Sequence, residues 1–305
     1  MYKLEAMQPF NLSNQSEFES WAENKLSLYA DDCLQTLLQP ILISGDGSIA
    51  ASELERLRSH IRDYNLAIYR VSDKTLFNKE SIDRMSRWLG LKQLDAHLCV
   101  GEDLISTITD TSQMPGDQRR TYIPYSNKAL SWHTDGYYNP YHQRVQAFIL
   151  YCQHAASSGG ENSFIDPEII YLHLRRENPD FITALCKADV MRIPENVQNQ
   201  TCIRAETASS VFQISDDYRH IDMRFSQRKR HIIWRDDRVT QQALESLNGL
   251  LNEDSAWRIN YRLQSCEGVI SNNVLHRRSA YKDDVGQSRV YIRARYYNRI
   301  TATNN

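Results

Sequence analysis

Apolar residues recur at helical spacing in three places within the first 90 residues, and this pattern predicts three helices. The first begins at a capping box that starts at Ser16, and it stops at Pro40. The second begins at Ser52, and the third closes at Gly90, a residue type that is common just after a helix C-terminus. Between these two helices, alternating apolar residues that start at Leu66 predict a strand.

After residue 104 the pattern changes to short runs rich in β-branched and aromatic residues. These runs predict strands, and two stretches with helical spacing interrupt them. Such a pattern is typical of a double-sheet jelly roll (a double-stranded β-helix), so we expect a mainly β (α+β) fold with flanking helices. The predicted strands cover residues 104–109, 145–151, 211–214, 269–275 and 290–295, and the predicted helices cover 167–176 and 239–251.

The chain of 305 residues can bury a large core, and 41% of its residues are hydrophobic. We expect a single domain over residues 41–305, with residues 1–40 as a helical extension packed on it, because β-barrels often exceed 200 residues as one unit. The formal net charge of −2 argues against nucleic acid as the partner. No apolar stretch has the length of a membrane span, and the start lacks the layout of a secretory signal.

The six cysteines are scattered and form no Cys-x-x-Cys pair. This spacing indicates reduced thiols rather than a disulfide framework or a zinc knuckle. Reduced thiols are typical of the cytoplasm, which is the location that we expect. The oligomeric state stays open.

His133 and Asp135 are two residues apart, so in an extended segment their side chains leave the same side. A distant histidine, His276, would complete a set of two imidazoles and one carboxylate around a metal ion. That set leaves neighbouring positions open and is the ligand choice of non-heme Fe(II) oxygenases. A lone His-x-Asp is also typical of a surface turn, and a lone histidine at a strand end is also typical of a core. The metal-site prediction therefore needs support from elsewhere in the chain.

Arg289 and Arg293 provide that support. Residues four apart in a strand face the same way, so both guanidinium groups leave one side of the segment. A planar guanidinium forms a bidentate pair with a carboxylate, a geometry that lysine cannot copy. The pair predicts a binding site for a carboxylate, and the alternative is a charged, solvated strand at a sheet edge.

The combined pattern resembles the TauD/TfdA family of Fe(II)- and 2-oxoglutarate-dependent dioxygenases, which includes taurine dioxygenase and enzymes similar to clavaminate synthase. The similarity runs from about residue 41 to the end of the chain. It implies a jelly-roll core, a bound Fe(II) ion, and 2-oxoglutarate and O2 as cosubstrates. The residues that carry it are His133-x-Asp135, the Gly-Gly-acid segment at 159–162, His276, and Arg289 with Arg293.

The resemblance also implies roles around the cosubstrate. Arg293 would take the far carboxylate of 2-oxoglutarate, and Arg289 would lie nearer the end that binds iron. Asn162 stands where the family has a threonine, and its amide can donate a hydrogen bond in place of the hydroxyl. Ser163 is the alternative donor. Neighbours in a strand face opposite sides, so only one of the two can serve unless the chain bulges there.

The primary substrate would bind near the His-x-Asp segment. Tyr137 and Tyr138 follow this segment and are candidates for the pocket wall, since such pockets are mostly apolar. Arg277 and Arg228 are candidates for binding an acidic group of the substrate. Relatives often have glycine at the position of Arg277, and the alternative for this residue is a side chain in solvent. The basic run 224–235 is flanked by aspartates, which favours a solvated charged face.

We therefore predict an Fe(II)- and 2-oxoglutarate-dependent dioxygenase that oxidises a C–H bond of a small molecule and releases succinate and CO2. Its substrate would be a small acidic or amino-acid-like molecule. The intact carboxylate of Asp135 favours hydroxylation or desaturation over halogenation, because the resemblance implies a small residue there in halogenases. The alternatives are a non-catalytic sensor or scaffold with the same metal and 2-oxoglutarate sites, and a jelly-roll zinc hydrolase. The hydrolase would not need the two arginines.

Overall fold

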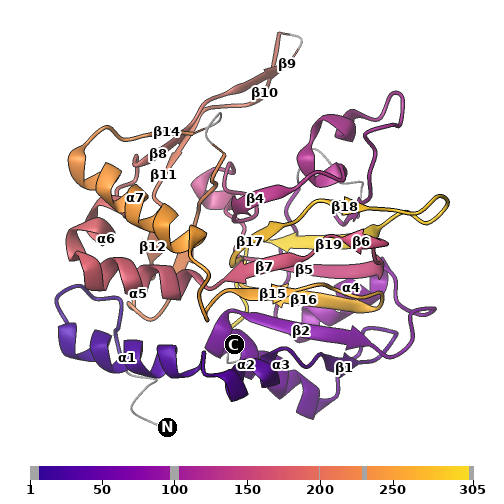
Figure 1. Ribbon diagram of the computed structural model, residues 1–305, viewed down its shortest axis with the longest axis horizontal. Coiled ribbons are helices and arrows are strands. Elements are labelled where there is room, and N and C mark those ends of the chain that lie inside the picture. The colour runs from indigo at the N-terminus through magenta and orange to yellow at the C-terminus, as the bar shows by residue number, and fades with distance from the viewer. Residues whose placement is uncertain (1–6, 97–102, 199, 229–231, 302–305) are drawn as a thin grey trace. The chain divides into compact units, whose positions relative to one another are not determined.

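The computed structural model describes residues 7–96, 103–198, 200–228 and 232–301 (Figure 1). The chain forms two compact units. The sheet unit comprises residues 31–131, 145–164 and 259–305, and the helical unit comprises residues 1–30, 132–144 and 165–258. The predicted division into an extension of residues 1–40 and one domain of residues 41–305 stays a prediction.

The sheet unit contains two β-sheets that face each other. The ring of Phe148 in the first sheet lies 5.1 Å from the ring of His276 in the second. Two sheets in contact with flanking helices are the arrangement that the sequence predicted. In order, the first sheet contains β1 (Ile41–Ile43), β2 (Leu66–Val71), β16 (Glu267–Ser271), β5 (Ala147–His154), β19 (Val290–Tyr296) and β3 (Ser106–Ile108). The second contains β15 (Ile259–Tyr261), β7 (Asn162–Ile165), β17 (Leu275–Arg278) and β4 (Leu130–His133). The boundary with the helical unit falls within β4, after residue 131, and before the last residue of β7. A short pair joins β18 (Tyr281–Lys282) to β6 (Ser158–Gly159).

The main core of the sheet unit lies between the first sheet and its helices, α3 (Ala51–Tyr64) and α4 (Lys79–Trp88). Leu57 and Met85 from these helices join Ile292 and Ala294 of β19 in one buried cluster. Because strand residues alternate between faces, the intervening residues of β19 point toward the second sheet. Packing of Ile292 and Ala294 in this cluster therefore determines the direction in which Arg293 and Arg295 of β19 point. The unit also contains α2 (Asp31–Leu37).

A corner between β16 and β17 carries the chain from the first sheet to the second. The sequence predicted one strand over residues 269–275, and this prediction is wrong because the backbone of Asn273 is left-handed, with φ 52°. The hydroxyl of Ser271 accepts a hydrogen bond from the backbone N–H of Val274 at 3.1 Å, which stabilises the corner. Asparagine tolerates this conformation better than most residues. The corner places His276 in the second strand position after the turn.

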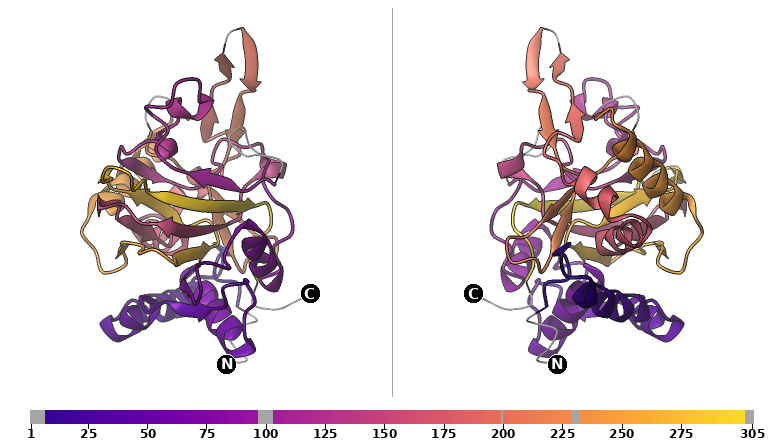
Figure 2. Two further views of the ribbon diagram at one scale, coloured as in Figure 1. Left: turned by 90° about the vertical axis from the view of Figure 1, so that its right-hand side faces the viewer. Right: turned by 90° about the vertical axis from the view of Figure 1, so that its left-hand side faces the viewer.

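The helical unit contains α1 (Gln15–Ser27), α5 (Pro167–Glu177), α6 (Pro179–Leu185) and α7 (Arg238–Asn252). The predicted continuous helix up to Pro40 is wrong, because α1 ends at Ser27 and a new helix begins at Asp31. Acidic residues at positions 31 and 32 favour a new helix N-terminus there. The unit's short strands are β8 (Met191–Ile193), β11 (Thr207–Ser209), β14 (Ile233–Trp234), β12 (Phe212–Ile214) and β13 (Ile221–Met223). The strands β9 (Asn196–Gln198) and β10 (Thr201–Arg204) pair as an arm, drawn in salmon at the top of Figure 2.

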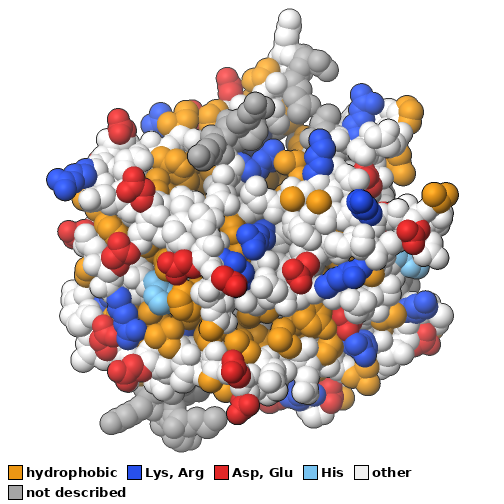
Figure 3. Space-filling model, viewed as in Figure 1, with side chains coloured by type: hydrophobic (Ala, Val, Ile, Leu, Met, Phe, Trp, Pro, Cys, Tyr) orange, Lys and Arg blue, Asp and Glu red, His pale blue; other side chains and the backbone are white. Residues whose placement is uncertain are grey.

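Charged side chains of both signs are interspersed over the face of the molecule in Figure 3. The described residues on this face form no extended surface of one charge, the feature that would attract a polyanion. Within the described part of the chain, each helix is too short or too polar to cross a lipid bilayer.

A buried charge cluster joins α1 to α5. The ammonium of Lys25 lies 2.6 Å from a carboxylate oxygen of Asp166 and 2.7 Å from one of Glu168. Asp166 also caps α5, since its carboxylate accepts a hydrogen bond from the backbone N–H of Glu168 at 2.9 Å. Buried charges are tolerated when they are paired in this way.

We expect Lys25→Met to lower the free energy of unfolding by about 3–5 kcal/mol, because it leaves two buried carboxylates without their cation. Arg87→Met is the matched control. Arg87 pairs with Asp83 on the exposed surface of α4, and its loss should cost less than about 0.5 kcal/mol. Urea unfolding followed by far-UV circular dichroism measures both. Equal losses in the two variants would show that the buried cluster does not stabilise the fold.

Candidate functional site

His133 is the last residue of β4, and Asp135 follows two residues later, where a turn begins. Beyond the end of the strand, the backbone N–H of Thr134 donates to the carbonyl of Phe225 at 3.0 Å, and the hydroxyl of Thr134 accepts from the N–H of Phe225 at 3.1 Å. His133 and Asp135 therefore leave the same side of the segment, as predicted. Both side chains are buried.

Arg224 fixes the turn that follows Asp135. Its guanidinium donates to the backbone carbonyl of Tyr137 at 2.9 Å and to that of Asn139. Burial lowers the pKa of Arg224 to about 10, so the group stays charged at neutral pH. The sequence predicted a solvated face for the basic run that begins here. That prediction is wrong for Arg224, which is 5% exposed.

The orientation of His276 is set by its own strand. Its Nδ1 lies 2.9 Å from the backbone carbonyl of Val274. A carbonyl oxygen only accepts, so Nδ1 carries the proton and Nε2 keeps its lone pair for a metal. A histidine that donates its other N–H to a backbone carbonyl is typical of metal sites.

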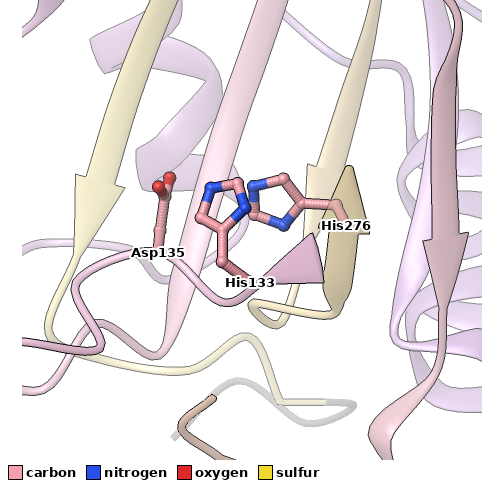
Figure 4. Close-up of side chains that lie close together, drawn as sticks. All are labelled: His133, Asp135 and His276. Atoms are coloured by element: carbon pink, nitrogen blue, oxygen red, sulfur yellow. The ribbon is translucent and has the colours of Figure 1, made fainter. Parts of the chain in front are cut away.

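The structure brings the three predicted ligands together. His133, Asp135 and His276 each offer one ligand atom, and these atoms lie within 4.8 Å of one another (Figure 4). Two neutral nitrogen donors and one anionic oxygen form a small, largely buried set, which fits Fe(II) with open coordination positions. The donor set thus meets the requirements of the ion that the sequence implied.

The two arginines lie at different distances from His276 along the first sheet. In β5, Phe148 contacts the ring of His276. Arg293 pairs with Leu150, two residues further along β5, whereas the residue after Arg289 pairs with His154, at the end of β5. Each strand residue advances about 3.3 Å. The backbone of Arg293 is therefore nearer to His276 than that of Arg289.

Arg289 is 3% exposed and lies against two tyrosines. Its guanidinium carbon is 3.6 Å from the ring centroid of Tyr291 and 4.9 Å from that of Tyr281. Among the described residues, no hydrogen-bond partner is present for its Nε and Nη1 atoms, which are buried. Such donors are rarely left unpaired in a folded protein, so these two nitrogen atoms are candidates for binding an anion.

Two further donors in the same region have the same property. The amide nitrogen of Asn162 and the hydroxyl of Tyr281 are buried, and neither has a hydrogen-bond partner in the described part of the chain. Gly160 lies beside them: a Cβ atom there would be 3.4 Å from the Cβ of Tyr281 and 3.9 Å from Nε of Arg289. Burial raises the pKa of Tyr281, so its hydroxyl stays protonated and can donate. Tyr281 was not predicted, and the only sequence signal was its position five residues after His276.

Asn162 and Ser163 have different surroundings. The hydroxyl of Ser163 accepts a hydrogen bond from Nε of Arg277 at 3.3 Å. Neighbouring residues of a strand face opposite sides, so Asn162 points away from Arg277. Arg277 itself is half-buried.

Three of the candidates for the substrate pocket, Tyr137, Tyr138 and Arg228, lie in the helical unit. The rings of Tyr137 and Tyr138 contact each other edge to face, with centroids 5.3 Å apart, directly after the His-x-Asp turn. Arg228 is half-buried and lines a cavity of the helical unit. Residues 229–231 of the basic run lie outside the described residues.

Several solved structures share the fold at low sequence identity. An asparagine oxygenase solved with Fe(II), 2S,3S-3-hydroxyasparagine and succinate is 16% identical, with 93% of this chain and 91% of that chain covered and a TM-score of 0.54. AAD-2, solved with Mn(II) and N-oxalylglycine, is 14% identical, with coverages of 88% and 93% and a TM-score of 0.56. A taurine dioxygenase from Burkholderia xenovorans is 14% identical, with coverages of 85% and 88% and a TM-score of 0.55. No curated protein matches the chain.

A sequence profile identifies the family. The profile of the taurine catabolism dioxygenase TauD, TfdA family matches residues 44–295, which is most of the chain. The match spans all three candidate ligands and both arginines, so the resemblance drawn from those residues is confirmed. The chain belongs to the TauD/TfdA family, and it is an Fe(II)- and 2-oxoglutarate-dependent dioxygenase with a jelly-roll core.

Proposed function

We propose that this dioxygenase hydroxylates an unactivated C–H bond of a small amino-acid-like substrate. With Fe(II) bound, the reaction consumes substrate, 2-oxoglutarate and O2 and yields the alcohol, succinate and CO2. The observation that carries the proposal is the close approach of the ligand atoms of His133, Asp135 and His276. Solved relatives of the same fold contain Fe(II) or Mn(II) together with succinate or N-oxalylglycine, which supports the same cofactor and cosubstrate here.

In this proposal each ligand has a distinct task. Asp135 supplies the negative charge that offsets the charge of the cation. His276 presents Nε2 because Val274 holds its Nδ1 proton. Arg224 keeps the turn after Asp135 in place, which limits the freedom of the carboxylate. Binding the ion with side chains held in this way avoids the entropy cost of ordering them.

We further propose that Arg289, Asn162 and Tyr281 bind the far carboxylate of 2-oxoglutarate. Together they offer several buried donors without partners among the described residues, and an anion would satisfy them. This assignment differs from the sequence-based prediction, which gave the far carboxylate to Arg293. Arg293, whose backbone lies nearer to His276, is then proposed to act close to the metal.

The substrate assignment draws on one solved relative and on the residues after the His-x-Asp turn. The asparagine oxygenase contains a hydroxylated amino acid, which supports an amino-acid-like substrate for this chain. Tyr137 and Tyr138 stay our candidates for the pocket wall, and Arg228 and Arg277 stay candidates for binding a polar group of the substrate. A cytoplasmic location also stays a proposal, supported by the five free cysteines of the described chain.

The test is succinate formation in air from 2-oxoglutarate, measured with Fe(II), with Zn(II), and without metal. The proposal predicts succinate only with Fe(II), and more of it when a suitable amino acid derivative is present. A sensor or scaffold would bind 2-oxoglutarate without forming succinate. A zinc hydrolase would be active with Zn(II) and indifferent to 2-oxoglutarate.

We expect Tyr281→Phe to raise KM for 2-oxoglutarate up to about 10-fold, because one hydrogen bond to a buried carboxylate is lost. The value of kcat should change little, since the hydroxyl lies away from the oxidised bond. Tyr151→Phe is the matched control: its hydroxyl is also buried, but its ring packs on Phe77 at 4.5 Å in the main core. An unchanged KM in Tyr281→Phe, or an equal rise in Tyr151→Phe, would contradict the role of Tyr281.

A further inference from the structure

Arg278, the last residue of β17, is a buried cation that contacts one short segment of the chain. It is 5% exposed. A buried charge destabilises a protein unless polar groups of the protein take the place of water around it. Here the Nη2 atom of the guanidinium donates to the backbone carbonyl of Ser126 at 2.8 Å and to that of Lys128 at 2.6 Å. Arg278 thereby holds residues 126–128, which lead into β4, against the end of β17.

The same short segment holds the backbone of Tyr281. The N–H of Tyr281 donates to the carbonyl of Asn127 at 3.1 Å, and Asn127 lies between the two residues whose carbonyls bind Arg278. On its other side, Tyr281 pairs with Gly159 where β18 lies beside β6 (Figure 1). A Cβ atom on Gly159 would lie 2.3 Å from the carbonyl oxygen of Ala280, so only glycine allows this close pairing. Tyr281 is therefore fixed from two sides, and one of them depends on Arg278.

The ring of Tyr281 lies against two cations. The guanidinium carbon of Arg278 and that of Arg289 are each 4.9 Å from the centroid of this ring. All three residues belong to the sheet unit. A guanidinium is attracted to an aromatic ring, so these contacts also restrain the ring. Like charges repel each other strongly in a buried region, and an anion bound to Arg289 offsets that repulsion. The second cation therefore increases the attraction of this region for a carboxylate.

We propose that Arg278 is a positioning residue for 2-oxoglutarate. It holds Tyr281 where the hydroxyl of Tyr281 and the guanidinium of Arg289 meet the far carboxylate together, and its charge strengthens the binding of that carboxylate. Arg278 acts through Tyr281 rather than by contact with the cosubstrate, because both hydrogens of its Nη2 atom are donated to backbone carbonyls. This inference rests on the proposed roles of Arg289 and Tyr281 and adds a residue to their site.

The experiment measures how strongly the protein prefers 2-oxoglutarate to 2-oxopentanoate, an acid without the far carboxylate. Isothermal titration calorimetry gives both dissociation constants for the full-length protein, loaded anaerobically with Fe(II). We expect Arg278→Met to reduce the ratio of the two constants by about 10-fold or more, the effect of losing one or two hydrogen bonds to a charged group. The change should come from weaker binding of 2-oxoglutarate, whereas binding of 2-oxopentanoate should stay nearly the same. A preference that survives in Arg278→Met would overturn the proposal.

Arg175→Met is the matched control. Arg175 is 2% exposed, its guanidinium donates to the backbone carbonyl of Pro9 at 2.8 Å, and its guanidinium carbon lies 3.9 Å from the ring centroid of Phe18. These contacts are of the same kind as those of Arg278, but they lie in the helical unit. The variant should lose stability in urea and keep the full preference for 2-oxoglutarate. An equal loss of preference in Arg175→Met would show a general loosening of the fold, and it would overturn the proposal.

Two further variants keep the test decisive if Arg278→Met does not fold. Arg278→Lys keeps the charge and can donate to both carbonyls, so it should recover most of the preference. Arg278→Gln still offers an amide donor to the segment but has no charge, and it should lose most of the preference. A preference that survives in Arg278→Gln, or one that Arg278→Lys loses as fully as Arg278→Gln does, would overturn the proposal. Equal binding of the two acids by the wild-type protein would instead contradict the proposed function.

Discussion

Asp135→Ala is expected to abolish succinate formation and to weaken Fe(II) binding more than about 100-fold. Even residues that only orient metal ligands change affinity by about 10–100-fold when they are replaced, and Asp135 is the anionic member of the donor set itself. Its removal leaves two neutral imidazoles, which cannot offset the charge of the ion. Anaerobic titration with Fe(II) measures the affinity, and succinate analysis measures turnover.

Asp216→Ala is the control for this variant. Asp216 is an exposed carboxylate of the same unit, so its loss changes the net charge by the same amount. It should bind Fe(II) as the wild-type protein does. If both variants bind Fe(II) equally well, Asp135 is not a ligand.

Arg289→Met is expected to raise KM for 2-oxoglutarate by about 100-fold or more. Hydrogen bonds to charged groups contribute about 1.5–3 kcal/mol each, and the guanidinium of Arg289 has two buried nitrogen atoms without partners among the described residues. Arg293→Met should raise this KM less, because we assign Arg293 to the metal end of the site. Initial rates at varied 2-oxoglutarate measure both variants.

A cosubstrate analogue identifies which carboxylate Arg289 binds. 2-Oxopentanoate has the same chain length as 2-oxoglutarate but lacks the far carboxylate. The wild-type protein should bind the diacid far more tightly, whereas Arg289→Met should bind both acids about equally. If that loss of preference appears in Arg293→Met instead, the far carboxylate belongs to Arg293, as the sequence alone predicted.

The long strands were predictable because several of their residues alternate between two packed faces. Strand β2 agrees with the pattern that starts at Leu66, and β19 covers the predicted residues 290–295 and one more. The corner at Asn273 was missed because apolar residues continue across it, and the apolar pattern does not report the left-handed backbone. The strands β8 to β14 have two to four residues each, too few to display an alternation.

The proposed metal ligands could be named from the sequence because His133-x-Asp135, the distant His276 and the two arginines together match one kind of chemistry, and the structure places the three ligand atoms within 4.8 Å of one another. The order of the two arginines was not predictable, because it depends on which residues of β5 lie opposite β19. Tyr281 was missed for a similar reason: its importance follows from the close approach of Gly160 and from the burial of its hydroxyl.

The central claim is that His133, Asp135 and His276 bind one Fe(II) ion that 2-oxoglutarate can chelate. Anaerobic titration of the Fe(II)-loaded protein with 2-oxoglutarate, followed by visible absorption, tests it most directly, because a 2-oxo acid chelated to Fe(II) gives a charge-transfer band. We predict a band that saturates at one equivalent per chain in the wild-type protein and is absent in His276→Ala. A wild-type protein without the band, or a band of equal strength in His276→Ala, would contradict the claim.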